Sequence, residues 1–243
     1  MAMAHLNRRQ LMGSIAVVTA TAPSGASAAV IEGALPWMPH HTAPPEAVRP
    51  GGWAYFSPAE AEAVEALVDR LIPPDPETPG GREAGCAVFI DRQLAGPYGR
   101  SEGLYTAGPF HDGTKQQGPQ SPATPASHYR QALAALDKHC RTAFNGAGFA
   151  TLSDAQKDAV VGDLENGKID LDDEPGSFFK QLLKDTQEGF FADPLYGGNK
   201  DMCAWKMIGF PGARYDYRDW VERHNERFPL PPVGIASHPR WKG

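Results

Sequence analysis

Residues 57–74, SPAEAEAVEALVDRLIPP, decide the fold class. Ser57 can accept a hydrogen bond from the first turn of a helix, Pro58 suits the first helical position, and Glu60 stands where a capping box needs an acceptor. The apolar residues that follow recur at helical spacing until two prolines end the run. These apolar residues are Ala61, Val64, Leu67, Val68, Leu71 and Ile72. The stretch therefore predicts a helix that buries one face.

Four further stretches downstream show the same helical spacing of apolar residues. They are residues 83–94, about 126–144, a stretch that starts at the Ser153–Gln156 capping box, and 178–191. Strand-like alternation of apolar and polar residues is nearly absent. We therefore expect an all-α fold, a small helical bundle of about five helices in which the fifth is the most buried.

Long Gly/Pro-rich segments interrupt the helices. Residues 96–124 form a loop of a length that usually serves a function or is disordered. Residues 29–56 combine Pro, Gly, His and Ala with scattered aromatic residues, which is typical of an extended arm that lies on an apolar surface. Residues 57–243 then make up one helical domain.

The N-terminal residues have the pattern of an export signal. Arg8 and Arg9 are adjacent and precede a weakly apolar stretch, residues 11–18. Small residues end at Ala28 in an Ala-x-Ala pattern, where a signal peptidase cuts. The arginine pair and the mild hydrophobicity favour a twin-arginine signal peptide over residues 1–28, and hence a periplasmic location. The alternative is a chance Arg-Arg pair before a disordered tail.

Composition and motifs exclude several classes of function. The formal net charge is −6 and no Lys/Arg-rich run occurs, which argues against nucleic-acid binding. None of the three cysteines lies in a C-x-x-C or C-x-x-C-H motif, so covalent haem and cysteine-rich metal sites have no support. Nucleotide-binding glycine loops and the common hydrolase and zinc-protease motifs are also missing from the sequence.

Two features leave a metal site open as an alternative. His128 and His139 could share one helix face, but they are too far apart to clasp one ion from that helix alone. An acidic cluster could bind calcium, although it lacks the ligand spacing of an EF-hand loop and fits a solvated turn better. Its members are Asp170, Asp172, Asp173 and Glu174.

The segment 193–217 stands out from an ordinary bundle. Tyr, Trp, Met and Arg lie among glycines there, a composition typical of a contact surface. The candidate interface residues are Tyr196, Cys203, Trp205, Phe210 and Tyr215. A lid packed on the chain's own bundle would have the same residue types, so both interpretations stay open at this point.

Three motifs carry a family resemblance. The leader is followed by Leu71-Ile72-Pro73 at the end of the first helix, by FIDRQLAGPYG at residues 89–99, and by the segment 193–217. Together they resemble the gluconate 2-dehydrogenase subunit 3 family over most of the mature chain. Its members are small, gamma subunits of bacterial membrane-bound sugar and sugar-acid dehydrogenases.

The resemblance implies a three-part enzyme that oxidises gluconate or a related sugar or sugar acid. A large flavoprotein holds FAD, and a multi-haem cytochrome c subunit passes electrons to quinone. The complex holds the small subunit at the inner membrane. The small subunit carries no cofactor, metal or catalytic residue. Its twin-arginine leader exports the folded flavoprotein together with it, and the aromatic arm and the segment 193–217 are expected to wrap that partner.

The resemblance also suggests a role for one cysteine. Related small subunits can be disulfide-linked to the catalytic chain, and Cys203 is the candidate for such a bond. Cys86 and Cys140 lie on apolar helix faces and are expected to be buried thiols or one internal pair.

Two rival functions remain from other classes. One is a self-sufficient periplasmic enzyme whose metal is held by His111, Asp112 and the acidic cluster. The other is a free-standing periplasmic binding or scaffold protein whose long loops recognise a small ligand.

Overall fold

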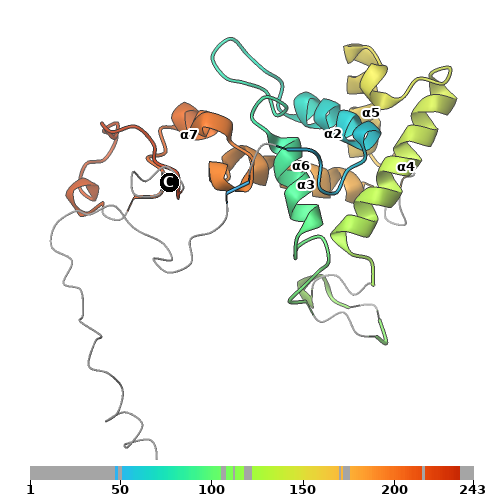
Figure 1. Ribbon diagram of the computed structural model, residues 1–243, viewed down its shortest axis with the longest axis horizontal. Coiled ribbons are helices and arrows are strands. Elements are labelled where there is room, and N and C mark those ends of the chain that lie inside the picture. The colour runs from blue at the N-terminus through green and yellow to red at the C-terminus, as the bar shows by residue number, and fades with distance from the viewer. Residues whose placement is uncertain are drawn as a thin grey trace, which may run out of the picture. The chain divides into compact units, whose positions relative to one another are not determined.

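The computed structural model describes residues 47–48, 51–104, 108–111, 113–117, 122–169, 171, 176–214 and 217–235 (Figure 1). The predicted leader, with Arg8, Arg9 and Ala28, lies outside the described residues, as does most of the predicted arm. Within the described residues the structure is helical, with no strand and one isolated bridge between Gly212 and Val233. The all-α prediction is confirmed.

The described chain contains six α-helices and five short 3₁₀ helices. The α-helices are α2 (Pro58–Leu71), α3 (Cys86–Ala95), α4 (Pro125–Ala143), α5 (Asp154–Glu165), α6 (Ser177–Phe191) and α7 (Cys203–Ile208). The 3₁₀ helices are η1 (Lys115–Gln117), η2 (Phe149–Thr151), η3 (Pro194–Tyr196), η4 (Lys200–Met202) and η5 (Arg218–Trp220). Helices α2 to α6 correspond to the five predicted stretches, and α7 is a further helix inside the candidate interface segment.

Side-chain caps fix where the main helices begin. The two capping boxes predicted at Ser57 and Ser153 both form, and the Ser57 backbone N–H donates to Glu60 Oε2 over 2.8 Å. A third box, missed in the sequence, starts α4: the Thr124 N–H donates to Ser127 Oγ over 2.9 Å. Each box satisfies N–H groups that have no partner within the first turn of the helix.

Helix α6 is the centre of the bundle, because it contacts α2, α3, α4 and α5. Its apolar face is buried through Phe178, Leu182 and Phe190. A glycine allows the closest approach to α3, since a Cβ atom at Gly189 would lie 2.9 Å from the Phe89 ring. The prediction that this helix is the most deeply buried agrees with these contacts.

The described end of the arm, residues 51–56, packs on the chain's own core. Phe56 is buried, and the Tyr55 ring lies beneath the Arg130 guanidinium at 4.3 Å. The buried carboxylate of Asp91 accepts hydrogen bonds from the backbone N–H groups of Ala54, Tyr55 and Phe56, at 2.8, 2.9 and 2.9 Å. These last residues of the arm therefore pack on the bundle, and the role of the arm in wrapping a partner stays a prediction.

Candidate functional site

Buried polar side chains anchor the candidate interface segment to the bundle. Asn199 is fully buried, and its amide donates to the Ala192 carbonyl and accepts from the Ala204 N–H, both at 2.9 Å. Asp193 caps η3 and also accepts from the Ile235 N–H over 2.7 Å. The start of the segment is therefore held in place by two hydrogen-bonded side chains, Asp193 and Asn199.

The backbone of this segment lies directly against α6. A Cβ atom at Gly198 would lie 2.1 Å from the Gly189 carbonyl oxygen, so only glycine fits there. Asn199, Asp201 and Met202 then adopt φ values of 46°, 56° and 57°. Such left-handed conformations are uncommon outside glycine and persist only where the surroundings enforce them. They turn the chain into α7.

Trp205, one of the candidate interface residues, is buried, with only 6% of its surface exposed. At this position the structure fits the alternative in which the segment packs on the chain's own bundle. Its indole N–H donates to the Phe191 carbonyl over 2.8 Å, and its ring meets the Phe210 ring edge-on at 5.1 Å between centroids. A large apolar ring with one donor is stable inside when that donor is satisfied. The buried Trp205 ring thus packs against the inner side of the exposed Phe210 ring.

The other predicted interface residues differ in their exposure. Tyr196 and Phe210 are each 43% exposed, whereas Cys203 is half-buried and Tyr215 lies outside the described residues. The Cys203 thiol points to Asn199 Oδ1 over 3.7 Å. Burial raises its pKa, which lowers the fraction of reactive thiolate at neutral pH. A disulfide from Cys203 to a partner stays a prediction.

The remaining two cysteines are buried thiols. Cys86 and Cys140 are both free, so they form no pair with each other. Burial raises the pKa of the Cys86 thiol to about 12 and that of the Cys140 thiol to about 11. Of the two alternatives open from the sequence, the structure favours separate inert thiols.

Exposed apolar side chains concentrate around the same segment. Seven of the nine large apolar side chains that are exposed among the described residues lie within residues 191–230. We call these seven the apolar surface: Phe191, Tyr196, Met207, Ile208, Phe210, Val221 and Leu230. Single exposed apolar side chains are common on soluble domains, but a concentration of them in one segment of the chain is typical of a binding site. The apolar surface is therefore the strongest candidate functional site.

A loop closed on itself extends this surface toward the C-terminus. In this C-terminal clasp, defined by the described residues 211–214 and 217–235, the Val233 carbonyl accepts from the Ala213 N–H over 2.6 Å and the Val233 N–H donates to the Pro211 carbonyl over 3.3 Å. Aromatic and cation–π contacts also link its side chains. They join Tyr217, Trp220 and Phe228 with Arg214 and Arg223. No local sequence pattern predicts this closure, since the paired residues are far apart in the chain.

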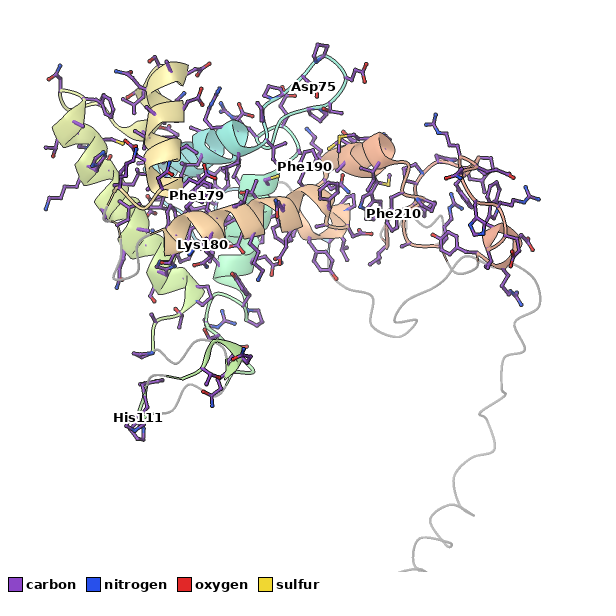
Figure 2. All side chains as sticks on the ribbon, turned by 180° about the vertical axis from the view of Figure 1, so that it is seen from behind. Asp75, His111, Phe179, Lys180, Phe190 and Phe210 are labelled. Atoms are coloured by element: carbon purple, nitrogen blue, oxygen red, sulfur yellow. The ribbon has the colours of Figure 1, made fainter. Side chains whose placement is uncertain are left out.

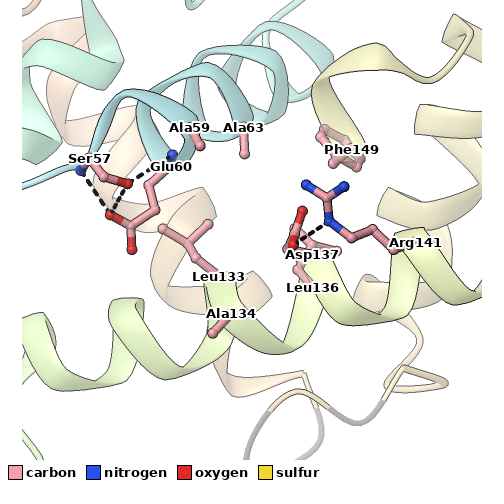
Figure 3. Close-up of a pocket in the computed structure, with 10 residues that line it drawn as sticks. All are labelled: Ser57, Ala59, Glu60, Ala63, Leu133, Ala134, Leu136, Asp137, Arg141 and Phe149. Atoms are coloured by element: carbon pink, nitrogen blue, oxygen red, sulfur yellow. Dashed lines mark hydrogen bonds and ion pairs between the residues drawn. The ribbon is translucent and has the colours of Figure 1, made fainter. Parts of the chain in front are cut away.

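A separate cavity of about 220 Å³ lies between α2, α4 and η2 (Figure 3). Its wall is largely apolar, with Leu133 and Phe149 among the lining residues. Its two carboxylates already have partners, since Asp137 pairs with Arg141 at 2.7 Å and Glu60 pairs with an arginine and the α2 cap. With these charges engaged, the cavity presents no group prepared for acid–base or nucleophilic chemistry.

A buried polar network crosses the bundle, and it was not predicted from the sequence. Asp185 on α6 accepts from the Tyr129 hydroxyl over 2.9 Å and from the Tyr98 hydroxyl over 3.1 Å. The Gln181 carbonyl oxygen lies 2.5 Å from His128 Nδ1, and its amide nitrogen lies 3.4 Å from the Tyr98 oxygen. The partners are distant in sequence, so no spacing pattern marks them. The network ties α4 and the loop after α3 to α6.

Asp185 should make the stability of the chain depend on pH. Burial raises its pKa from 3.8 to about 6, although the two tyrosine hydroxyls oppose this shift. A raised folded-state pKa means that the folded chain holds the proton more tightly than the unfolded chain does. The resulting contribution of Asp185 to the free energy of unfolding is present below about pH 4 and is lost as pH rises through about 6. We expect Asp185→Asn to flatten the fall in unfolding free energy between these pH values, measured by urea denaturation. An unchanged pH profile in this variant would contradict the assignment.

The described part of the chain does not support the alternative of a metal site. There, no group of three or more His, Cys, Asp and Glu side chains is placed to hold an ion. His128 contacts Gln181 and Ser177 in place of His139. Asp112 and the acidic cluster Asp170, Asp172, Asp173 and Glu174 lie outside the described residues, so the site predicted with His111 stays a prediction.

No helix in the described ranges combines the length and the apolar character needed to cross a membrane.

Comparison with known proteins gives a family match over much of the chain. A family model described as Gluconate 2-dehydrogenase subunit 3 matches residues 58–212. The matched range begins with the first residue of α2 and ends at Gly212, within the first residues of the C-terminal clasp. No curated protein and no solved structure matches the chain.

Proposed function

The chain belongs to the gluconate 2-dehydrogenase subunit 3 family, and from this premise we propose that it is the non-catalytic small subunit of a periplasmic, membrane-bound dehydrogenase. The enzyme oxidises gluconate or a related sugar or sugar acid. Its FAD lies in a large flavoprotein subunit and its haem c in a multi-haem cytochrome subunit. The small subunit holds the flavoprotein in a stable, export-competent complex.

The apolar surface is the observation that carries this proposal. It lies on residues that are themselves fixed in place by Asn199, Asp193 and the buried Trp205. Buried hydrogen bonds thus hold Phe210 and its neighbours in an exposed position. This arrangement is typical of a surface that binds another protein. Most of this surface lies inside the range that matches the family, which links the surface to the family's role as a subunit.

Four buried titratable groups of the described chain have structural surroundings, which supports a non-catalytic role. Asp91 and Asp185 are buried acceptors of structural hydrogen bonds, and Cys86 and Cys140 are buried thiols. Hydride and electron transfer need a cofactor to carry them. In our proposal both reactions therefore take place in the partner subunits.

Export connects the leader to the partner. A flavoprotein that folds around FAD in the cytoplasm has to cross the membrane folded, which is what the twin-arginine route allows. We propose that the leader on this chain, with its Arg8–Arg9 pair and its cut after Ala28, serves both chains. The small subunit must then bind the flavoprotein before transport.

Replacing the arginine pair tests this proposal. We expect Arg8→Lys together with Arg9→Lys to leave the FAD subunit in the cytoplasm and to remove dehydrogenase activity from the membrane fraction. The matched control is Arg82→Lys with Arg100→Lys, two arginines whose side chains are 62% and 54% exposed. Arrival of the FAD subunit in the periplasm at its normal level with the leader variant would refute the shared export.

A further inference from the structure

A groove of about 380 Å³ lies between the end of α7 and the C-terminal clasp. Phe210, which is labelled in Figure 2, is one of its lining residues. We call this groove the C-terminal groove. Its lining consists of residues 205, 206 and 209–211 on one side and residues 227–232 on the other. Its volume falls within the range of about 300–1,000 Å³ that is typical of ligand sites.

The walls of the groove are apolar and stiff. Phe210 and Leu230 are 43% and 54% exposed along it, and Trp205 supports Phe210 from the inside. Prolines make up much of the rest, at residues 211, 229, 231 and 232. Proline fixes the backbone angle φ, so little conformational freedom remains to be lost when something binds.

The charge of the groove is positive. Lys206 and Arg227 are exposed lining residues, and neither forms an ion pair with any residue that the structure describes. No carboxylate belongs to the lining. The chain as a whole has a formal charge of −6, so the groove is a local exception. Its charge is complementary to carboxylates.

The two sides of the groove differ in their relation to the family. The residues around α7 lie inside the matched range 58–212, whereas residues 227–232 follow it. Closure of the clasp through Gly212 and Val233 brings the second side against the first. Residues beyond the matched range therefore form one side of the C-terminal groove, and the matched range alone does not form the groove.

We propose that the C-terminal groove is the docking site for a peptide segment of a partner subunit, one that carries an apolar side chain next to Asp or Glu. The apolar side chain packs against Phe210 and Leu230, and the carboxylate pairs with Lys206 and Arg227. This inference rests on the proposed function, because it takes the occupant from another subunit of the same dehydrogenase. A concave, proline-walled groove fits a peptide segment better than the flat surface of a bilayer.

Charge reversal in the groove is the first test. We expect Lys206→Glu with Arg227→Glu, in the full chain produced together with its partners, to reduce the flavin- and haem-containing subunits recovered with it by about tenfold or more at moderate salt. Both side chains are exposed, so folding should persist, and a thermal melt of each purified chain checks this. The matched control reverses two exposed lysines on other helices, Lys138→Glu with Lys180→Glu.

A photo-crosslinking amino acid at Leu230 is the second test, with Leu104, which is also exposed and lies in another loop, as control. The proposal expects a crosslink from residue 230 to a peptide of another subunit in which Asp or Glu neighbours the linked residue. Crosslinks to lipid, to a second copy of this chain, or to a partner peptide without acidic residues would overturn it.

The outcomes separate this inference from the proposed function. If the unaltered chain recovers flavin and haem subunits and the groove variant recovers as much, the groove proposal fails and the proposed function stands. If the unaltered chain recovers neither subunit, both fail together.

Discussion

Asp91→Ala is expected to lower the free energy of unfolding by about 3 kcal/mol or more, because three backbone N–H groups lose their acceptor. The carboxylate is fully buried, and it holds residues 54–56 against α3 just before α2 begins. An unsatisfied buried donor costs about 1–3 kcal/mol, and the Phe56 N–H is such a buried donor, while those of Ala54 and Tyr55 are part-buried. Urea denaturation of the purified chain measures the change.

An exposed aspartate supplies the matched control for this prediction. Asp75 also accepts from two backbone N–H groups, those of Glu77 and Thr78, but in an exposed loop (Figure 2). Water can replace its carboxylate, so Asp75→Ala should change the unfolding free energy much less than Asp91→Ala does. Equal losses in the two variants would show that the burial of Asp91 has no special role.

Trp205→Ala is expected to disrupt the candidate interface segment while the bundle remains folded. Truncation of a buried Trp to Ala typically costs about 3–5 kcal/mol, and here it also removes the ring under Phe210 and the hydrogen bond to Phe191. We expect faster hydrogen exchange over residues 193–211, unchanged exchange in α2 to α5, and loss of the partner subunits on purification. Trp205→Phe keeps an aromatic ring but loses the N–H donor and part of the buried ring volume, so it should have a smaller effect than Trp205→Ala. If Trp205→Ala left exchange in the segment unchanged, its supporting role would be wrong.

Local sequence signals predicted the helical bundle well. The capping boxes at Ser57 and Ser153 and the prolines after α2 mark helix ends by short-range chemistry, and the structure contains them. The second helix begins later than expected, at Cys86 in place of residue 83. Gly85 is responsible, because it adopts a φ of 82° and passes close to the carbonyl of Gly197. That constraint comes from a distant part of the chain, so helical spacing alone does not reveal it.

Exposure within the interface segment was harder to predict. Aromatic residues among glycines pointed to the correct segment, but composition does not distinguish Phe210, which is exposed, from Trp205, which is buried under it. Helix α7 lacks a cap signal and depends on the buried amide of Asn199. The Asp185 network and the C-terminal clasp join residues far apart in sequence, and such contacts appear only once the chain is folded.

The most direct test of the account is to purify the tagged full chain from membranes in mild detergent. Mass spectrometry identifies what accompanies it, and an absorption spectrum reports flavin and haem. The account predicts a large FAD protein and a multi-haem cytochrome c in constant ratio to this chain. A colourless chain recovered alone under these conditions would contradict its assignment as a dehydrogenase subunit.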